Sequence, residues 1–139
     1  MRGAGRESIE HTADLAIRIW APDLAGLIEQ AAEGMIDLIV AERMEAEGTV
    51  EVEGEGSTPE ELLVDCLREV LLLIELEGLV PVEVQVGTVE QGRATLTVGV
   101  VALEQARETL QEDIKAVTYH GLEIDESDDV LQAEVVFDV

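Results

Sequence analysis

The sequence predicts an α+β fold, a three-layer β/α/β sandwich in which two helices pack between largely antiparallel sheets. The first half of the chain alternates strand and helix patterns, whereas the second half is largely strand patterns joined by short turns. The helix expected after residue 58 is apolar around most of its circumference, so it needs cover on more than one side. No linker, repeat or low-complexity tract divides the 139 residues, and we expect a single domain over 1–139.

The first half begins with a strand predicted over residues 15–20, where large aliphatic residues occupy every second position. Pro22 and Asp23 then break the strand, and Asp23 is a candidate N-cap for a helix that runs to about Val40. Residues 49–54 alternate valine with glutamate, which predicts a second short strand.

The second helix has the clearest boundary signals in the chain. Thr58 is a candidate N-cap, Pro59 occupies the first helical position, and Glu61 stands where a capping box places its acid. Gly78 follows the last turn as the expected C-terminal stop.

The second half is predicted to be mostly strand. Strands are expected over 80–86 and 94–100 with a turn at 90–93, a helical turn or loop over 102–111, a long strand over 114–124, an acidic turn over 125–129, and a final strand over 131–139. The long strand is expected to place its even-numbered residues, Ile114 to Ile124, on one face. The final strand is expected to place its odd-numbered residues, Leu131 to Val139, together.

Composition and charge exclude several classes of protein. The hydrophobic fraction of 47% excludes intrinsic disorder, and the aromatic fraction of 2% excludes a base-stacking single-strand binder. The 32 acidic residues outnumber the 8 basic ones and give a formal net charge of -24. Such a surface repels phosphates, so direct binding to nucleic acid or to an anionic membrane is not expected. A basic protein partner or a divalent cation fits this charge, and a purely solubilising role remains an alternative.

The cysteine and histidine content limits the site chemistry further. Cys66 is the only cysteine, so an internal disulfide is excluded, and its place in the apolar helix favours a buried small side chain. His11 and His120 are the only histidines and are too few for a multi-histidine zinc site. The sequence has neither a glycine-rich phosphate loop nor a nucleophile elbow. The amino-terminal residues do not form a signal peptide and the longest apolar run, 70–74, is too short for a bilayer, so we expect a cytoplasmic protein.

Three short segments are candidates for a functional site. The first is HTAD at 11–14, for which a turn before the strand is the simpler interpretation. The second is 114–120, where Lys115, the only lysine, could neutralise a phosphate or form an ordinary surface salt bridge.

The third segment is 136–139, where the carboxylates of Asp138 and of the Val139 terminus stand side by side. Two carboxylates so close repel each other unless a cation is present, and oxygen ligands suit Ca²⁺ or Mg²⁺. The alternative for this segment is a frayed terminal strand.

These three segments, in this order and spacing, resemble the archease family. The most specific pieces are HTAD at 11–14 and AVTYH at 116–120, preceded by Ile114 and Lys115. The VEVEG stretch at 50–54, the helix at 61–79 and the closing VVFDV at 135–139 are also similar to the family. The resemblance extends from His11 to Val139.

The resemblance implies a function and a set of site residues. Archeases are small acidic proteins with a β/α/β fold that assist the RtcB-type tRNA-splicing RNA ligase by promoting its guanylylation and multiple turnover. The family's metal ligands carry over to Asp14, to Asp138 and to a main-chain oxygen of Val139, and its functional lysine carries over to Lys115. The implied cofactor is a divalent metal, with Ca²⁺ as first choice and Mg²⁺ or Mn²⁺ as alternatives.

Two departures from the family pattern are visible. Cys66 stands where relatives usually have an aromatic residue, and 98–110 lacks a Gly-Glu-Pro-aromatic element common in the family before its lysine motif.

Two other functions remain open beside the activator. One is an acidic chaperone or scaffold for RNA-modifying enzymes. The other is a metal-dependent hydrolase with Asp14 and Asp138 as metal ligands and His11 or His120 as base. The activator hypothesis predicts a protein that is not itself an enzyme.

Overall fold

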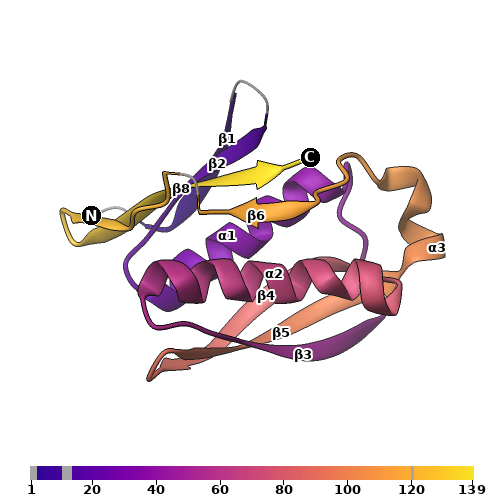
Figure 1. The fold of residues 1–139 in the computed structure, drawn as a ribbon. Helices are drawn as coiled ribbons and strands as arrows, with labels where there is room; N and C mark the ends of the chain where they lie inside the picture. The colour runs from indigo at the N-terminus through magenta and orange to yellow at the C-terminus, as the bar shows by residue number, and fades with distance from the viewer. Residues whose placement is uncertain (1–2, 11–13, 120) are drawn as a thin grey trace.

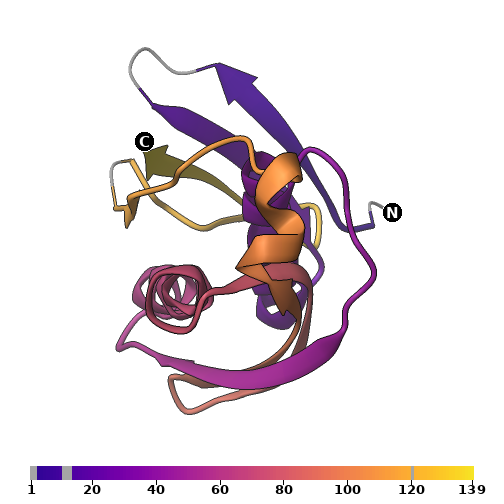
Figure 2. The same ribbon diagram turned by 90° about the vertical axis from the view of Figure 1, so that its right-hand side faces the viewer.

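The computed structural model describes residues 3–10, 14–119 and 121–139. These residues form a five-stranded sheet, a layer of two long helices and a three-stranded sheet (Figure 1). A view turned by 90° shows the two helices between the sheets (Figure 2). The predicted α+β sandwich is therefore confirmed.

The elements are named in chain order. They are β1 (Gly5–Glu10), β2 (Leu15–Ala21), α1 (Leu24–Ile39), β3 (Gly48–Glu55), α2 (Pro59–Glu77), β4 (Leu79–Glu90), β5 (Arg93–Ala102), the short α3 (Leu103–Ala106), the 3₁₀ turn η1 (Arg107–Thr109), β6 (Ala116–Thr118), β7 (Asp125–Ser127) and β8 (Val130–Asp138).

The five-stranded sheet is built around β8. Its strand order is β1-β2-β8-β6, and β7 also pairs with β8. All pairs are antiparallel, with β6 along the end of β8 and β7 along its beginning. The three-stranded sheet has the order β3-β5-β4 and is also antiparallel.

The predicted helix caps are present. The Asp23 carboxylate accepts a hydrogen bond from Gly26 N at 2.7 Å, and Thr58 Oγ1 accepts one from Glu61 N at 3.1 Å. Gly78 ends α2 with φ 66°, in the left-handed region that glycine adopts without strain. These caps satisfy backbone groups that would otherwise lack a partner at the helix ends.

The core lies on both sides of the helix layer. The five-stranded sheet contributes the buried side chains of Ile17, Ile19 and Phe137. The three-stranded sheet contributes those of Leu96 and Val98. The alternation predicted for the final strand is confirmed for Ala133, Val135 and Phe137, which face this core, whereas Val139 lies beyond β8 and is exposed. No described helix is long and apolar enough to cross a membrane.

The long strand predicted over 114–124 is wrong. Only Ala116–Thr118 form β6, because Leu122 N donates to Tyr119 O at 3.0 Å and Gly121 adopts φ 66°, which turns the chain. Within β6 the predicted face is also wrong, since Val117 is buried opposite Phe137 while Ala116 is exposed. Outside β6, Ile114, Leu122 and Ile124 of the predicted face do contact the core.

The acidic turn is shorter than predicted. Asp125–Ser127 pair with β8, and only Asp128 and Asp129 connect the two strands, with φ values of 53° and 62°. Positive φ at both positions is typical of a type I′ hairpin, whose twist matches the flanking strands. The helical turn expected within 102–111 is present as α3 and η1.

The sequence pattern does not predict strand β1. Its sequence, GRESIE, offers one large aliphatic residue and no alternating apolar face. The strand is held by its pairing with β2 over six residue pairs, from Gly5 opposite Trp20 to Glu10 opposite Leu15.

Candidate functional site

Asp14, Lys115 and Asp138, one residue from each of the three candidate segments, lie at one end of β8. The last residue pair between β2 and β8 is Leu15 opposite Phe137. Asp14, which precedes Leu15, and Asp138, which follows Phe137, therefore lie at the same end of the sheet. On the other side of β8, Asp138 pairs with Ala116, the residue after Lys115. Because β8 lies between β2 and β6, residues far apart in the sequence become neighbours at this end of the sheet.

Lys115 is tied to this place by its backbone. Its N–H donates to Asp138 O at 2.8 Å, while its side chain is exposed. Within the described part of the chain, no carboxylate forms an ion pair with the Lys115 ammonium.

The acidic side of the site consists of oxygen donors. Asp14 is partly buried, and Asp138 and Val139 are exposed. Carboxylate and main-chain oxygens are the donor types that a hard divalent cation prefers. No cluster of three or more His, Cys, Asp or Glu side chains in 3–10, 14–119 and 121–139 is arranged to bind a metal, so such an ion would also need main-chain or water ligands. His11 and His120 lie outside the described residues.

A groove of about 760 Å³ opens between α2 and the chain that leads into β6. We call it the α2 groove. Its apolar lining includes Leu71, Leu72, Ile74, Leu110 and Ile114. Lys115 lines it as well, together with the charged residues Arg68, Glu75, Glu112 and Asp113. The groove thus adjoins the site that contains Asp138.

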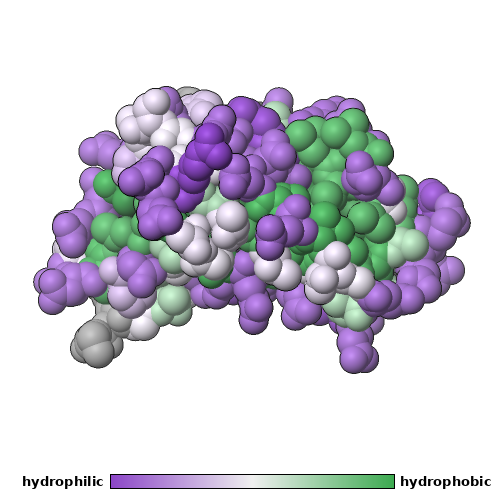
Figure 3. Space-filling view, turned by 90° about the horizontal axis from the view of Figure 1, so that it is seen from below, coloured by the Kyte–Doolittle hydropathy of each residue, from purple (hydrophilic) through white to green (hydrophobic). Residues whose placement is uncertain are grey.

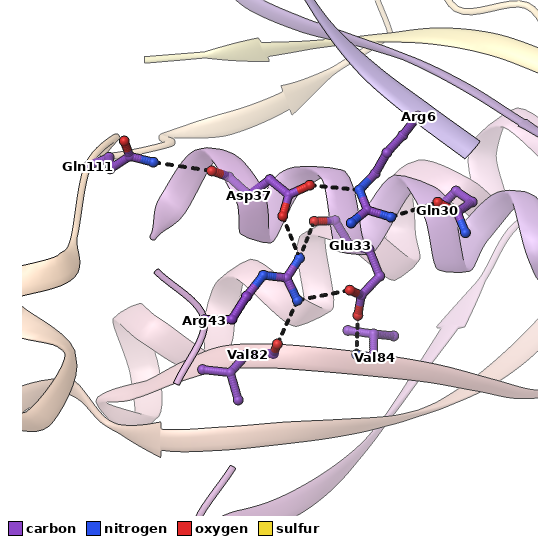
Figure 4. Close-up of polar contacts among 8 residues, drawn as sticks. All are labelled: Arg6, Gln30, Glu33, Asp37, Arg43, Val82, Val84 and Gln111. Atoms are coloured by element: carbon purple, nitrogen blue, oxygen red, sulfur yellow. Dashed lines mark hydrogen bonds and ion pairs between the residues drawn. The ribbon is translucent and has the colours of Figure 1, made fainter. Parts of the chain in front are cut away.

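The wall of the α2 groove is anchored to the end of α1. Gln111 N donates to Ile39 O at 2.7 Å, and Glu112 N donates to Leu38 O at 3.2 Å. The Gln111 side chain also donates to Asp37 O at 3.2 Å (Figure 4). These bonds satisfy carbonyls at the end of α1 and hold the wall in place.

An ion-pair cluster fixes α1 itself. The Asp37 carboxylate bonds to Arg6 of β1 at 2.7 Å and to Arg43 at 2.8 Å, and Arg43 also donates to Val82 O of β4 (Figure 4). Burial alone would raise the pKa of Asp37, but the hydrogen bonds and charges of Arg6 and Arg43 outweigh it and lower that pKa. The cluster links both sheets to the helix layer.

A second, polar pocket of about 500 Å³ lies at the other end of α2. Its lining includes Glu55, Asp65, Arg68 and Tyr119, and also Glu61, whose Oε2 atom is buried without a hydrogen-bond partner among the described residues. The capping box predicted at Thr58 is therefore incomplete in hydrogen bonding, although its first bond is formed.

Cys66 is a core residue. Burial, with smaller contributions from the charges of Asp65 and Glu69, raises the pKa of its thiol to about 12. The thiolate, which is the reactive form, is scarcely populated near neutral pH. The predicted burial of Cys66 is confirmed, and its raised pKa agrees with an unreactive thiol.

The α2 groove was not predicted from the sequence. The apolar circumference of α2 was visible, but it was interpreted as surface covered by the two sheets. Seven α2 residues, from Leu62 to Leu73, are indeed buried, whereas Leu72 is only partly covered and Leu76 is 69% exposed. A hydropathy pattern does not show how much of a helix the neighbouring strands and loops cover.

The model of the archease protein family matches residues 7–139. Proteins named archease are similar over most of their length. The protein from Methanopyrus kandleri is 35% identical over 137 residues, covering 96% of this chain and 98% of its own. The protein from Pyrococcus abyssi is 34% identical over 127 residues, with 88% of this chain and 89% of its own covered.

Two solved structures share the fold. The solution structure of protein 1598 from Methanobacterium thermoautotrophicum has a TM-score of 0.69 and 26% identity, over 97% of this chain and 99% of that chain. A crystal structure from Thermotoga maritima, described as an archease and possible chaperone, has a TM-score of 0.69 and 27% identity, over 100% of this chain and 98% of that one. Sequence and fold agree along nearly the whole length, and this chain belongs to the archease family.

Proposed function

We propose that this chain is an accessory protein that activates an RtcB-type tRNA-splicing RNA ligase by promoting guanylylation of the ligase and its multiple turnover. It has no catalytic role of its own in this proposal. The observation that carries it is the meeting of Asp14, Lys115 and Asp138 at one end of β8 in a chain of the archease family.

In the proposed mechanism the carboxylates of this site bind a metal ion and Lys115 contacts phosphate. Asp14, Asp138 and a main-chain oxygen of Val139 hold a divalent cation, with Ca²⁺ as first choice and Mg²⁺ or Mn²⁺ as alternatives. The bound cation supplies positive charge that can neutralise phosphate oxygens. The carboxylates position that charge, and their own repulsion is relieved by it.

Lys115 supplies the second positive charge. Its ammonium is exposed beside the carboxylates and can contact a phosphate of GTP as a compact, strongly hydrated charge. The rest of the surface repels phosphates, because the chain carries a net charge of -24. Lysine and cation would together make this end of β8 a local exception to that repulsion.

The acidic surface also fits the proposed partner. A ligase that binds RNA needs a basic face, and opposite charge on two proteins accelerates their encounter and orients it. This argument explains a large acidic excess without requiring contact between the chain and RNA.

The test is transfer of labelled guanylate from GTP to an RtcB-type ligase, with a divalent metal present, in the presence and absence of this protein. Faster labelling by the wild-type chain is expected, and Asp14→Asn and Lys115→Met should each abolish the stimulation. Asp125→Asn removes one exposed carboxylate on β7 and should stimulate like wild type. Stimulation that survives both site variants would contradict the proposed mechanism.

A chaperone or scaffold role is the second candidate, favoured by the strongly acidic surface. The Thermotoga maritima relative is described as a possible chaperone. In that role Asp14 and Lys115 are dispensable, whereas replacing several surface glutamates by lysine abolishes function. The two sets of variants in one assay therefore separate the candidates.

A further inference from the structure

We infer that the α2 groove is a docking site for an apolar segment of the partner ligase that carries lysine or arginine at one end. This inference rests on the proposed function, because it names the surface that places the partner beside Lys115. Four features of the groove support it: its apolar lining, its fixed outer wall, its negative charge and its continuity with the candidate site.

The first step is that the groove exposes apolar surface that the chain itself leaves uncovered. Leu71, Leu72 and Ile74 are partly exposed on α2, and Leu110 is 37% exposed on the opposite wall. Figure 3 faces a different side, seen from below, where hydrophobic residues also gather in one patch. Apolar lining in a preformed hollow is typical of a surface that a partner covers.

The second step is that the groove is held open before any partner binds. Its outer wall, around Gln111 and Glu112, is fixed by three hydrogen bonds to the last residues of α1. A wall fixed in this way loses little conformational freedom on binding, which favours affinity.

The third step is the negative charge along the groove and at the C-terminus of α2. Glu75, Glu112 and Asp113 lie along the groove, and Glu77 ends the helix. The last turn of α2 contains no basic residue, although the carbonyls at a helix C-terminus favour positive charge. A lysine or arginine of the partner would complement both the carboxylates and the helix end.

The same charge argues against a second copy of this chain as the occupant. Two copies would bring like-charged groove rims together, each on a molecule with a net charge of -24. A basic partner is attracted by the same negative charge that makes two copies of this chain repel each other.

The fourth step is continuity with the candidate site. Lys115 lines the groove, and its N–H is bonded to Asp138 O. A segment seated in the groove would therefore bring the body of the ligase against the end of β8. Docking and activation would occur side by side on one surface.

The test compares two substitutions one helical turn apart. Leu72 lines the groove, whereas Leu76 is 69% exposed on the same helix outside the lining. Leu72→Glu should raise the concentration of this protein needed for half-maximal ligase labelling by at least about tenfold, and should leave the maximal rate unchanged. Leu76→Glu should behave as wild type.

A second variant tests the charge and protects against misfolding of the first. Glu112→Lys alters an exposed side chain at the rim, so its fold should be retained. We expect weaker binding to the ligase and a smaller loss of binding with added salt than in wild type. Circular dichroism melts of all variants identify any that fail to fold.

The outcomes separate this inference from the proposed function. If wild type stimulates labelling and Leu72→Glu and Glu112→Lys match it at every concentration, the groove proposal is wrong and the activator proposal stands. If wild type binds the ligase without stimulating it, the activator proposal fails and the same variants in the binding assay decide the groove. A concentration-dependent dimer lost in Leu72→Glu, or a small apolar molecule found bound by native mass spectrometry, would overturn the inference in favour of another occupant.

Discussion

The contact between Gly54 of β3 and Cys66 of α2 limits how closely a helix can approach the three-stranded sheet. A Cβ atom at Gly54 would lie 2.5 Å from Cys66 Sγ, 2.9 Å from its backbone N and 3.0 Å from its Cα. Because two of these atoms are backbone, a change of side-chain rotamer cannot relieve the clash. The close approach of α2 to β3 at this point therefore requires glycine at position 54, opposite the small side chain of Cys66.

We predict that Gly54→Ala destabilises the protein by about 1–3 kcal/mol, since α2 must move away from β3. Denaturant unfolding would measure the change in free energy. Gly48→Ala is the matched control on the same strand, because its nearest neighbour, Val100 Cγ2, is 4.0 Å away. Cys66→Ala in the Gly54→Ala background should recover only part of the loss, and full recovery would show that the backbone contact is unimportant.

Asp37 gives a second prediction at the residue scale. Its folded-state pKa lies below the ordinary value of 3.8, so its contribution to stability is complete above that value and is lost as the pH falls through the folded pKa. The difference in unfolding free energy between wild type and Asp37→Asn should therefore be largest above about pH 4 and shrink at lower pH. A difference that stays constant down to pH 2 would contradict this ionic account.

At the scale of elements, side chains of α1 cover the open edge of β4. Val84 N donates to Glu33 Oε2 at 2.7 Å, and Val86 N donates to Glu29 Oε1 at 3.0 Å. These N–H groups belong to an edge strand and would otherwise be available to another chain. Two glutamates one helical turn apart thus match two N–H groups two residues apart on the strand.

We predict that Glu33→Ala destabilises the fold by about 1–3 kcal/mol, because Val84 N–H loses its partner in a partly buried place. The substitution also removes the 2.9 Å ion pair with Arg43. Thermal and denaturant unfolding would measure the effect, with Glu75→Ala as control for removing one glutamate from an exposed helix position. A control variant destabilised by the same amount would show that the lost charge, and not the strand edge, is responsible.

How well the sequence predicts each element depends on whether its signal is local. The helices were predicted with their caps because Asp23, Thr58 and Gly78 act on backbone groups a few residues away. Strand β1 and the short β6 depend on pairing with distant strands, and their own patterns were absent or misleading. The stretch 114–124 alternates polar and apolar residues, yet the turn at Gly121 divides it.

The candidate site shows the same division. The motifs around Asp14, Lys115 and Asp138 could be identified from sequence through their resemblance to a family, and the register of β8 then explains why they meet. The α2 groove could not be predicted, because it depends on where the chain near Leu110 crosses α2. Residues 109–112 are placed by hydrogen bonds to the end of α1, some 70 positions earlier in the sequence.

For the whole molecule, the net charge of -24 sets how stability responds to salt. Carboxylates that repel one another across the surface destabilise the compact state, and this repulsion is screened within about 10 Å at 0.1 M salt. We therefore expect the melting temperature to rise as NaCl increases from low concentration, even though surface ion pairs such as Arg18–Glu7 weaken. This general effect must be separated from any specific binding of a cation.

A metal site at the end of β8 predicts a stabilisation by Ca²⁺ that exceeds screening. At constant ionic strength, a ligand present at 100 times its dissociation constant adds about 2.7 kcal/mol to the free energy of unfolding. Wild type should show this increase, and Asp138→Asn should lose it, because one ligand of the proposed set is gone. Asp125→Asn removes the same charge from exposed β7, so it should keep the wild-type response. Equal responses in all three proteins would mean that Ca²⁺ acts on the acidic surface as a whole, and the ligand set of Asp14, Asp138 and Val139 would then have to be abandoned.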